Sequence, residues 1–128
     1  MKYLVIGGVA GGATVAARLR RLDEQADIIL FERGEYVSYA NCGLPYYIGG
    51  EINDRKKLFV QTVQGFIDRF RIDIRTLQEV TAIHTDMKSI EVKNLKTGEV
   101  YTETYDKLAL SPGAEPLRPG IEGIDNKK

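Results

Sequence analysis

The stretch Tyr3-Leu4-Val5-Ile6-Gly7-Gly8-Val9-Ala10-Gly11-Gly12 predicts the fold of this chain. It opens with an unbroken apolar run that ends at glycine, which is typical of a parallel strand buried on both faces. From Gly12 to about Leu22, small and apolar residues recur at helical spacing. A second apolar run at 28–31 then completes a βαβ unit.

The glycine-rich turn of this unit lies where a dinucleotide-binding fold needs close backbone approach to a pyrophosphate. Counted as G-x-G-x-x-G, the first and third glycines are Gly7 and Gly12, whereas Val9 departs from the fingerprint at the second. Glu32 follows at the end of the second strand, where a carboxylate accepts hydrogen bonds from both ribose hydroxyls. We therefore expect a dinucleotide site, although these positions do not separate FAD from NAD. The alternative is a glycine-rich helix cap beside an ordinary surface glutamate.

The rest of the chain predicts an α/β fold with a parallel sheet and a small antiparallel β-meander. A short helix or tight coil is expected among the glycines and prolines of residues 43–50, and a helix is expected at 63–70. Strands are expected at 72–74, at 80–84, 89–93 and 100–105 in the meander, and, as one more buried strand, at 108–110. Prolines and glycines after Ser111 exclude regular structure there.

Composition narrows the classes of partner. Lysine plus arginine and aspartate plus glutamate number 18 each, so no net charge is available to hold nucleic acid or an acidic membrane surface. One cysteine forms no internal disulfide, and no cysteine/histidine cluster accompanies it to bind a metal. We expect no metal site, no membrane span and a reducing, cytoplasmic setting.

That cysteine, Cys42, lies in Ser38-Tyr39-Ala40-Asn41-Cys42-Gly43-Leu44-Pro45-Tyr46-Tyr47. The segment predicts a helical turn directly after the cysteine, and free N–H groups at the start of a helix favour a thiolate. Glycine and proline neighbours argue against a deeply buried, inert thiol. Cys42 is therefore the candidate catalytic residue.

Five motifs together resemble the coenzyme A disulfide reductases of the pyridine nucleotide-disulfide oxidoreductase family, especially the type fused to a rhodanese domain. They are Gly7 to Gly12, Phe31-Glu32-Arg33, Ser38 through Gly50, Asp54-Arg55, and Tyr105-Asp106-Lys107 through Ser111-Pro112-Gly113. The resemblance covers the whole chain but only about the first quarter of such an enzyme. It implies that residues 1–128 are the N-terminal part of a Rossmann-like FAD-binding domain, without the NAD-binding and dimerisation domains. We expect such a fragment to bind FAD weakly and to be inactive.

The resemblance also implies FAD as the bound cofactor, with NAD(P)H as co-substrate of the parent enzyme. Ser111-Pro112-Gly113 resembles the family's second FAD-contacting turn, where Ala-Thr-Gly is commoner. The residues expected to contact FAD are Gly7, Gly8, Val9, Ala10, Gly11, Gly12, Glu32, Arg33, Val80, Ser111 and Gly113.

Coenzyme A is the substrate or ligand that the resemblance implies for Cys42. Relatives with a Cys-x-x-x-x-Cys dithiol carry a second cysteine where this chain has Tyr47, so Cys42 must form its mixed disulfide or persulfide with an external partner. A lysine that some members use aligns with Phe70, between Arg69 and Arg71, which leaves the phosphate contacts open. The matching coenzyme A positions are Thr14, Arg18, Arg21, Ser38 and Asn41.

Two other functions stay open. An NADH oxidase or peroxidase would cycle the same cysteine through a sulfenic acid, but peroxide-reducing relatives need a histidine near the first helix, and the only one here is His84. A non-enzymatic nucleotide-binding module would carry an unreactive thiol, and a solvated helix face would explain Arg18 and Arg21. The sequence leaves open whether the parent enzyme uses NADH or NADPH and whether its substrate is a disulfide or a persulfide. We expect the parent to be a homodimer.

Overall fold

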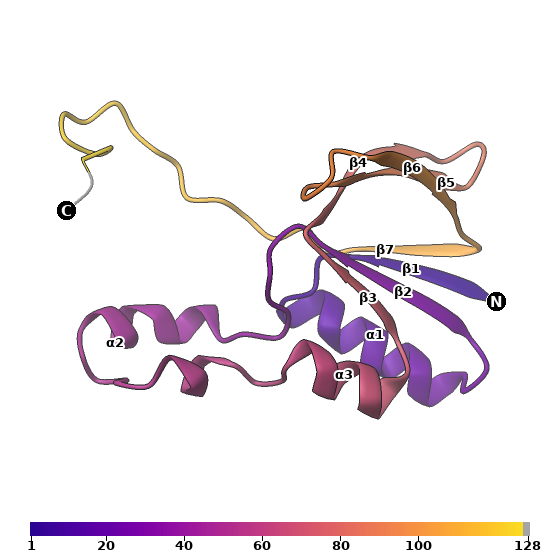
Figure 1. The fold of residues 1–128 in the computed structure, drawn as a ribbon, viewed down its shortest axis with the longest axis horizontal. Helices are drawn as coiled ribbons and strands as arrows, with labels where there is room; N and C mark the ends of the chain where they lie inside the picture. Colours follow the sequence, from indigo (N-terminus) through magenta and orange to yellow (C-terminus); the bar gives the residue numbers. More distant parts are fainter. Residues whose placement is uncertain (127–128) are drawn as a thin grey trace.

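The computed structural model describes residues 1–126. Residues 1–70 contain three α-helices, two short 3-10 helices and two strands, and residues 71–126 contain five strands and no helix (Figure 1). In chain order the elements are β1 (Lys2–Ile6), α1 (Ala10–Leu22), β2 (Asp27–Glu32), η1 (Asn41–Gly43), α2 (Leu44–Ile48), η2 (Arg55–Leu58), α3 (Val63–Phe70), β3 (Asp73–Thr76), β4 (Gln78–His84), β5 (Ser89–Asn94), β6 (Val100–Thr104) and β7 (Lys107–Leu110).

The expected α/β architecture is confirmed. Four parallel strands form one sheet in the order β3-β2-β1-β7, and β4-β5-β6 form a separate antiparallel sheet. Figure 1 shows α1 and α3 on one face of the parallel sheet and the meander over the other face. The glycine turn follows the carboxyl end of β1 and lies beside the carboxyl end of β2. In open α/β sheets, ligands bind at this carboxyl edge.

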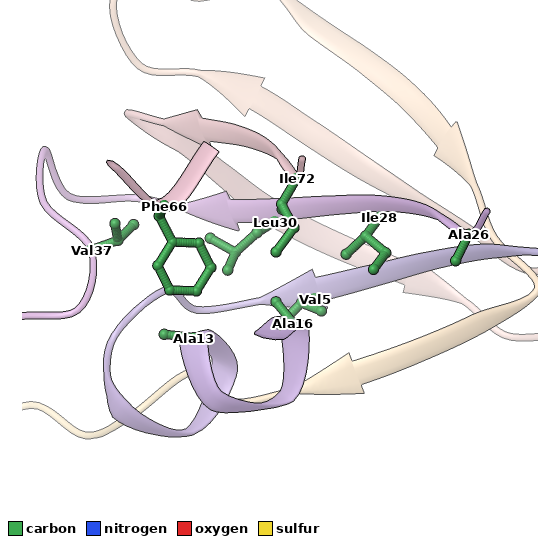
Figure 2. Packing of buried hydrophobic residues seen from close by; sticks show 9 residues of the cluster. All are labelled: Val5, Ala13, Ala16, Ala26, Ile28, Leu30, Val37, Phe66 and Ile72. Carbon is green, nitrogen blue, oxygen red and sulfur yellow. The ribbon is translucent and has the colours of Figure 1, made fainter. Parts of the chain in front are cut away.

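Side chains of β2 alternate between two cores, which explains its unbroken apolar sequence. Ile28 and Leu30 point towards the helices, where they pack with Ala13, Ala16 and Phe66 among others (Figure 2). Ile29 and Phe31 point the other way and pack against Ile90 and Val92 of the meander. Both faces of the sheet are covered, as a continuous hydrophobic strand requires.

Three local expectations need correction. Helix α1 begins at Ala10 rather than Gly12, because the positive φ of Gly7 (+93°) lets the chain turn within three residues. The 3-10 turn η2 has no clear periodic signal and was not expected. Strand β7 forms, but it is only partly buried. Leu108 and Ala109 are half-buried, whereas Leu110 is 59% exposed, because within residues 1–126 β7 is an edge strand that pairs with β1 alone.

Arg75 joins the two sheets. Its guanidinium carbon lies 5.4 Å from the ring centroid of Phe31 on β2 and 5.8 Å from that of Tyr101 on β6. It donates hydrogen bonds to Asp73 (2.7 Å), Glu103 (2.9 Å) and the Tyr101 hydroxyl (3.1 Å). Although burial opposes the charged form, these hydrogen bonds raise the pKa of Arg75 above its ordinary range. The meander is thus held over Phe31 and the end of β2.

Among residues 1–126, no helix has both the length and the apolar character that crossing a bilayer would need.

Candidate functional site

The glycine turn is packed so closely that side chains are excluded at two of its positions. A Cβ atom on Gly7 would lie 2.0 Å from the carbonyl oxygen of Ser111, and one on Gly12 would lie 1.7 Å from the carbonyl oxygen of Gly7. The amide of Gly7 also donates to the carbonyl of Phe31 (2.8 Å). The turn is therefore held against β2 and against the segment that follows β7.

Glu32 is fixed by the backbone around it. One carboxylate oxygen accepts the amide N–H of Gly8 (3.0 Å) and the other accepts that of Gly34 (2.6 Å). A carboxylate oxygen accepts more than one hydrogen bond, so Glu32 retains acceptor capacity towards the groove that it lines. Gly8 is buried, and its N–H donates to Glu32, so its part in the site is to orient that carboxylate.

Two adjacent cavities lie at this edge of the sheet. A groove of about 240 Å³ is bounded by Val9, Glu32, Arg33, Ser111 and Gly113 among others. A smaller cavity of about 130 Å³ shares Glu32 and Arg33 and extends to Gly7 and Val80, bringing the meander to the site. Gly8, Gly11 and Gly12 line neither cavity. The residues present fit an adenosine diphosphate group: a glycine-rich turn that a phosphate can approach closely, a carboxylate at Glu32 for the ribose hydroxyls and a guanidinium at Arg33.

Cys42 was expected immediately before the first helical turn. It instead lies inside that turn, the 3-10 helix η1, which is followed directly by α2. Its thiol is free and exposed. It lines a larger cavity of about 780 Å³ between α1 and α3. The same cavity is lined by every residue for which a coenzyme A contact was expected: Thr14, Arg18, Arg21, Ser38 and Asn41.

Backbone hydrogen bonds fix the segment that carries Cys42. Ser38, with φ of +54°, donates its amide N–H to the Gly8 carbonyl (2.8 Å) and accepts the amide of Val60 (2.9 Å). Ala40 donates its amide to the carbonyl of Leu58 (2.6 Å). The left-handed conformation is sparsely populated for serine, so its surroundings must hold it. The cysteine segment is thus tied to the glycine turn on one side and to η2 on the other.

Sequence reasoning missed several residues of this cavity. Val60, Gln61, Phe66 and Arg69 line it from the far side. These residues lie about twenty or more positions after Cys42 in the chain. Pairing of the Val60 amide with the Ser38 carbonyl places Val60 and Gln61 at the cavity, and the packing of α3 against α1 places Phe66 and Arg69 there. Of the two arginines that flank Phe70, Arg69 lines the cavity and Arg71 does not.

Arg20 makes that helix packing possible. Its guanidinium donates to the carbonyls of Phe70 (2.8 Å) and Arg71 (2.8 Å) at the end of α3. It also donates to the carbonyls of Glu24 (2.9 Å) and Ala26 (2.7 Å) after α1. Unpaired carbonyls at a helix end need such donors. Arg20 is therefore structural, whereas its neighbours Arg18 and Arg21 face the cavity.

In residues 1–126, no three histidine, cysteine, aspartate or glutamate side chains gather as a metal site would require. His84 lies in the meander, on β4, with its Nε2 atom 3.6 Å from a carboxylate oxygen of Glu91. It is not among the residues that line the Cys42 cavity.

The family model for pyridine nucleotide-disulphide oxidoreductases matches residues 1–128. The chain belongs to this family. It is 49% identical over 121 residues to the coenzyme A disulfide reductase of Staphylococcus aureus strain JH9, covering 94% of this chain and 28% of that protein. The chain thus spans a little over a quarter of that curated relative.

Two solved structures share the fold closely. Reduced CoADR-RHD of Bacillus anthracis is 60% identical, with a TM-score of 0.93 over 99% of this chain and 23% of that one. A NAD-dependent persulfide reductase from A. fulgidus is 37% identical, with a TM-score of 0.90 over 98% of this chain and 23% of that one.

Proposed function

We propose that this chain is the N-terminal, FAD-binding part of an enzyme that reduces coenzyme A disulfide or coenzyme A persulfide at the expense of NAD(P)H. The supporting observation is that one cavity contains both the exposed thiol of Cys42 and the guanidinium groups of Arg18 and Arg21. A thiol is needed for disulfide exchange, and guanidinium groups are suited to phosphates. The names of the relatives point to the same chemistry.

FAD would be held at the carboxyl edge of the parallel sheet. The turn from Gly7 to Gly12 would admit the pyrophosphate, Glu32 would accept the ribose hydroxyls, and Arg33 and Val80 would border the adenosine. Ser111 and Gly113 would close the groove on the side of β7. When bound, FAD supplies the two electrons, taken from NAD(P)H, that return Cys42 to its thiolate.

The part played by Cys42 follows from disulfide exchange. Its thiolate attacks one sulfur of coenzyme A disulfide, a bond forms between the two sulfurs, and the other coenzyme A leaves as a thiolate. With coenzyme A persulfide, attack on the sulfur bonded to carbon releases hydrosulfide instead. Both routes leave Cys42 in a mixed disulfide with coenzyme A. Two-electron reduction then releases the second coenzyme A thiolate.

The other cavity residues would bind and orient the substrate. Arg18 and Arg21 would pair with its phosphates, while Ser38 and Asn41 would hold the arm that leads to the sulfur. The hydroxyl of Thr14 donates to the carbonyl of Ala10 (2.8 Å), which leaves its oxygen as an acceptor. These contacts would place the substrate sulfur in line with Cys42.

An oxidase or peroxidase that forms a sulfenic acid at Cys42 is a weaker candidate. Oxygen and peroxide are small and lack phosphate groups. Their binding would therefore need neither a cavity of about 780 Å³ nor the arginines that line it. A module with an inert thiol is disfavoured by the exposure of Cys42.

Mass spectrometry of the full-length protein, purified without reductant, tests the proposal. We expect a coenzyme A adduct at Cys42 together with the visible spectrum of bound FAD. Cys42→Ser should remove the adduct and lower turnover by about 10³-fold or more while keeping the flavin. Bound FAD with only a sulfenic acid would instead support the oxidase, and absence of both would support the inert module.

We further propose that residues 1–128 alone bind FAD weakly and do not turn over, because the other domains of such an enzyme would complete the site. The whole enzyme would be a homodimer. A reducing, cytoplasmic setting would suit a single exposed thiol that must remain available. Nucleic acid and membrane surfaces are not expected partners, since the chain carries no net charge.

A further inference from the structure

Arg69 is the one arginine of the Cys42 cavity for which the sequence predicted no ligand contact. It lies in the last turn of α3 and lines the cavity opposite Arg18 and Arg21 of α1. Two helices that are distant in sequence thus present three guanidinium groups to one cavity.

The aromatic ring of Phe70 is in contact with two of these cations. The guanidinium carbon of Arg69 is 5.2 Å from the ring centroid, and that of Arg21 is 5.8 Å from it. Both distances are within the range of a cation–π contact. Phe70 itself lines the cavity and packs on Phe66, with ring centroids 4.9 Å apart. The ring therefore orients both arginines without neutralising either.

These cations have no anionic partner within the chain. In the described part of the chain, 1–126, none of Arg18, Arg21 and Arg69 forms an ion pair with a carboxylate. Arg20, in contrast, is fully engaged with backbone carbonyls. Like charges brought together around one cavity repel each other, and an anionic ligand relieves that repulsion.

We propose that Arg69 is a specificity-determining residue that, with Arg18 and Arg21, binds the phosphate groups of the thiol substrate. This inference rests on the proposed function. The side chain of Arg69 would take the place of the lysine that some family members align with Phe70. Phe70 would serve as the platform that holds Arg69 and Arg21 towards the ligand. Arg71 has no such part, since its guanidinium reaches the carbonyl of Glu24 (3.5 Å) outside the cavity.

Steady-state kinetics of the full-length enzyme with two substrates test the inference. Coenzyme A disulfide carries phosphates, whereas pantethine is a disulfide with the same thiol arm and no phosphate. For Arg69→Met we expect KM for coenzyme A disulfide to rise about tenfold with little change in kcat, since a charge-assisted hydrogen bond is lost. The kinetics with pantethine should stay the same. Arg69→Lys should recover most of the loss.

Arg71→Asn is the matched control, because it removes the same charge two residues away and asparagine tolerates the left-handed backbone there (φ +50°). It should leave both substrates unaffected. Equal losses of Arg69→Met on both substrates, or no loss on either, would overturn the inference while leaving the proposed function intact. A wild-type enzyme that reduces neither these two disulfides nor coenzyme A persulfide would overturn the proposed function, and the inference with it.

Discussion

A Cβ atom on Gly12 would lie 1.7 Å from the carbonyl oxygen of Gly7. The clashing atom belongs to the backbone, so the first turn of α1 would have to move away from Gly7. For Gly12→Ala we expect a loss of about 3 kcal/mol or more in the free energy of unfolding, together with loss of bound flavin. Urea denaturation and the flavin absorbance of the purified protein measure both.

Gly11→Ala is the control for this substitution. A Cβ atom there would lie 3.2 Å from the side-chain oxygen of Ser111, which rotates away more easily than backbone does. Alanine also favours the helix by about 1 kcal/mol over glycine. We therefore expect a change in stability within about 1 kcal/mol. A Gly12→Ala protein as stable as Gly11→Ala would contradict the packing described for the turn.

Glu32→Gln should separate the orienting contacts of this carboxylate from its charge. Glutamine keeps one oxygen, but its NH2 group faces a backbone N–H that now has no acceptor. We expect about 1–3 kcal/mol less stability from that unsatisfied donor, and a flavin affinity lowered at least about tenfold. Flavin titration of the apoprotein measures the affinity. Glu51→Gln, at an exposed position outside the described cavities, should change neither quantity.

Arg18 and Arg20 lie two residues apart on α1, and their substitution should affect different properties: substrate binding for Arg18 and stability for Arg20. Arg20→Met removes the donors that hold the end of α3, so we expect a loss of about 2 kcal/mol or more in the free energy of unfolding. Arg18→Met should leave stability within about 0.5 kcal/mol and raise KM for coenzyme A disulfide. Thermal or urea unfolding and kinetics on the same preparations distinguish the two. Equal loss of stability in both would show that Arg18 is structural too.

Local patterns predict most elements of this fold, because most of its strands and helices have a strong periodic signal, whereas the short turn η2 has none. The apolar runs of β1 and β2 predict a sheet covered on both faces, and the two core clusters confirm it. The error at β7 has a physical cause: the sequence of Leu108-Ala109-Leu110 does not reveal that the strand lies at the edge of the sheet.

The candidate site was predictable where its residues lie near recognisable motifs. Resemblance placed Cys42, Arg18 and Asn41 at one site, and the structure brings them to one cavity. Arg69 lies on α3, which carries no comparable motif, and its position depends on how α3 docks on α1. The same applies to Arg75, whose partners Phe31 and Tyr101 meet only when the meander folds over the sheet.

Glu103 should make the attachment of the meander sensitive to acid. Burial alone would raise the pKa of Glu103, but hydrogen bonds from Lys2 and Arg75, with their charges, lower it below its ordinary value of 4.5. A carboxyl group whose pKa is lower in the folded state stabilises that state above its unfolded pKa. This stabilisation is lost as the pH falls through the lower, folded value.

Comparison of wild type with Glu103→Gln across pH checks the sign. Near neutral pH we expect the variant to be less stable by about 1–2 kcal/mol, because the ionised hydrogen bonds to Lys2 and Arg75 are lost. Urea unfolding should show that this difference stays constant down to about pH 5 and shrinks at lower pH as Glu103 of the wild type takes up a proton. A difference that persists unchanged to about pH 3, or one that grows there, would mean that this carboxylate is not what holds the meander to β1 and β3.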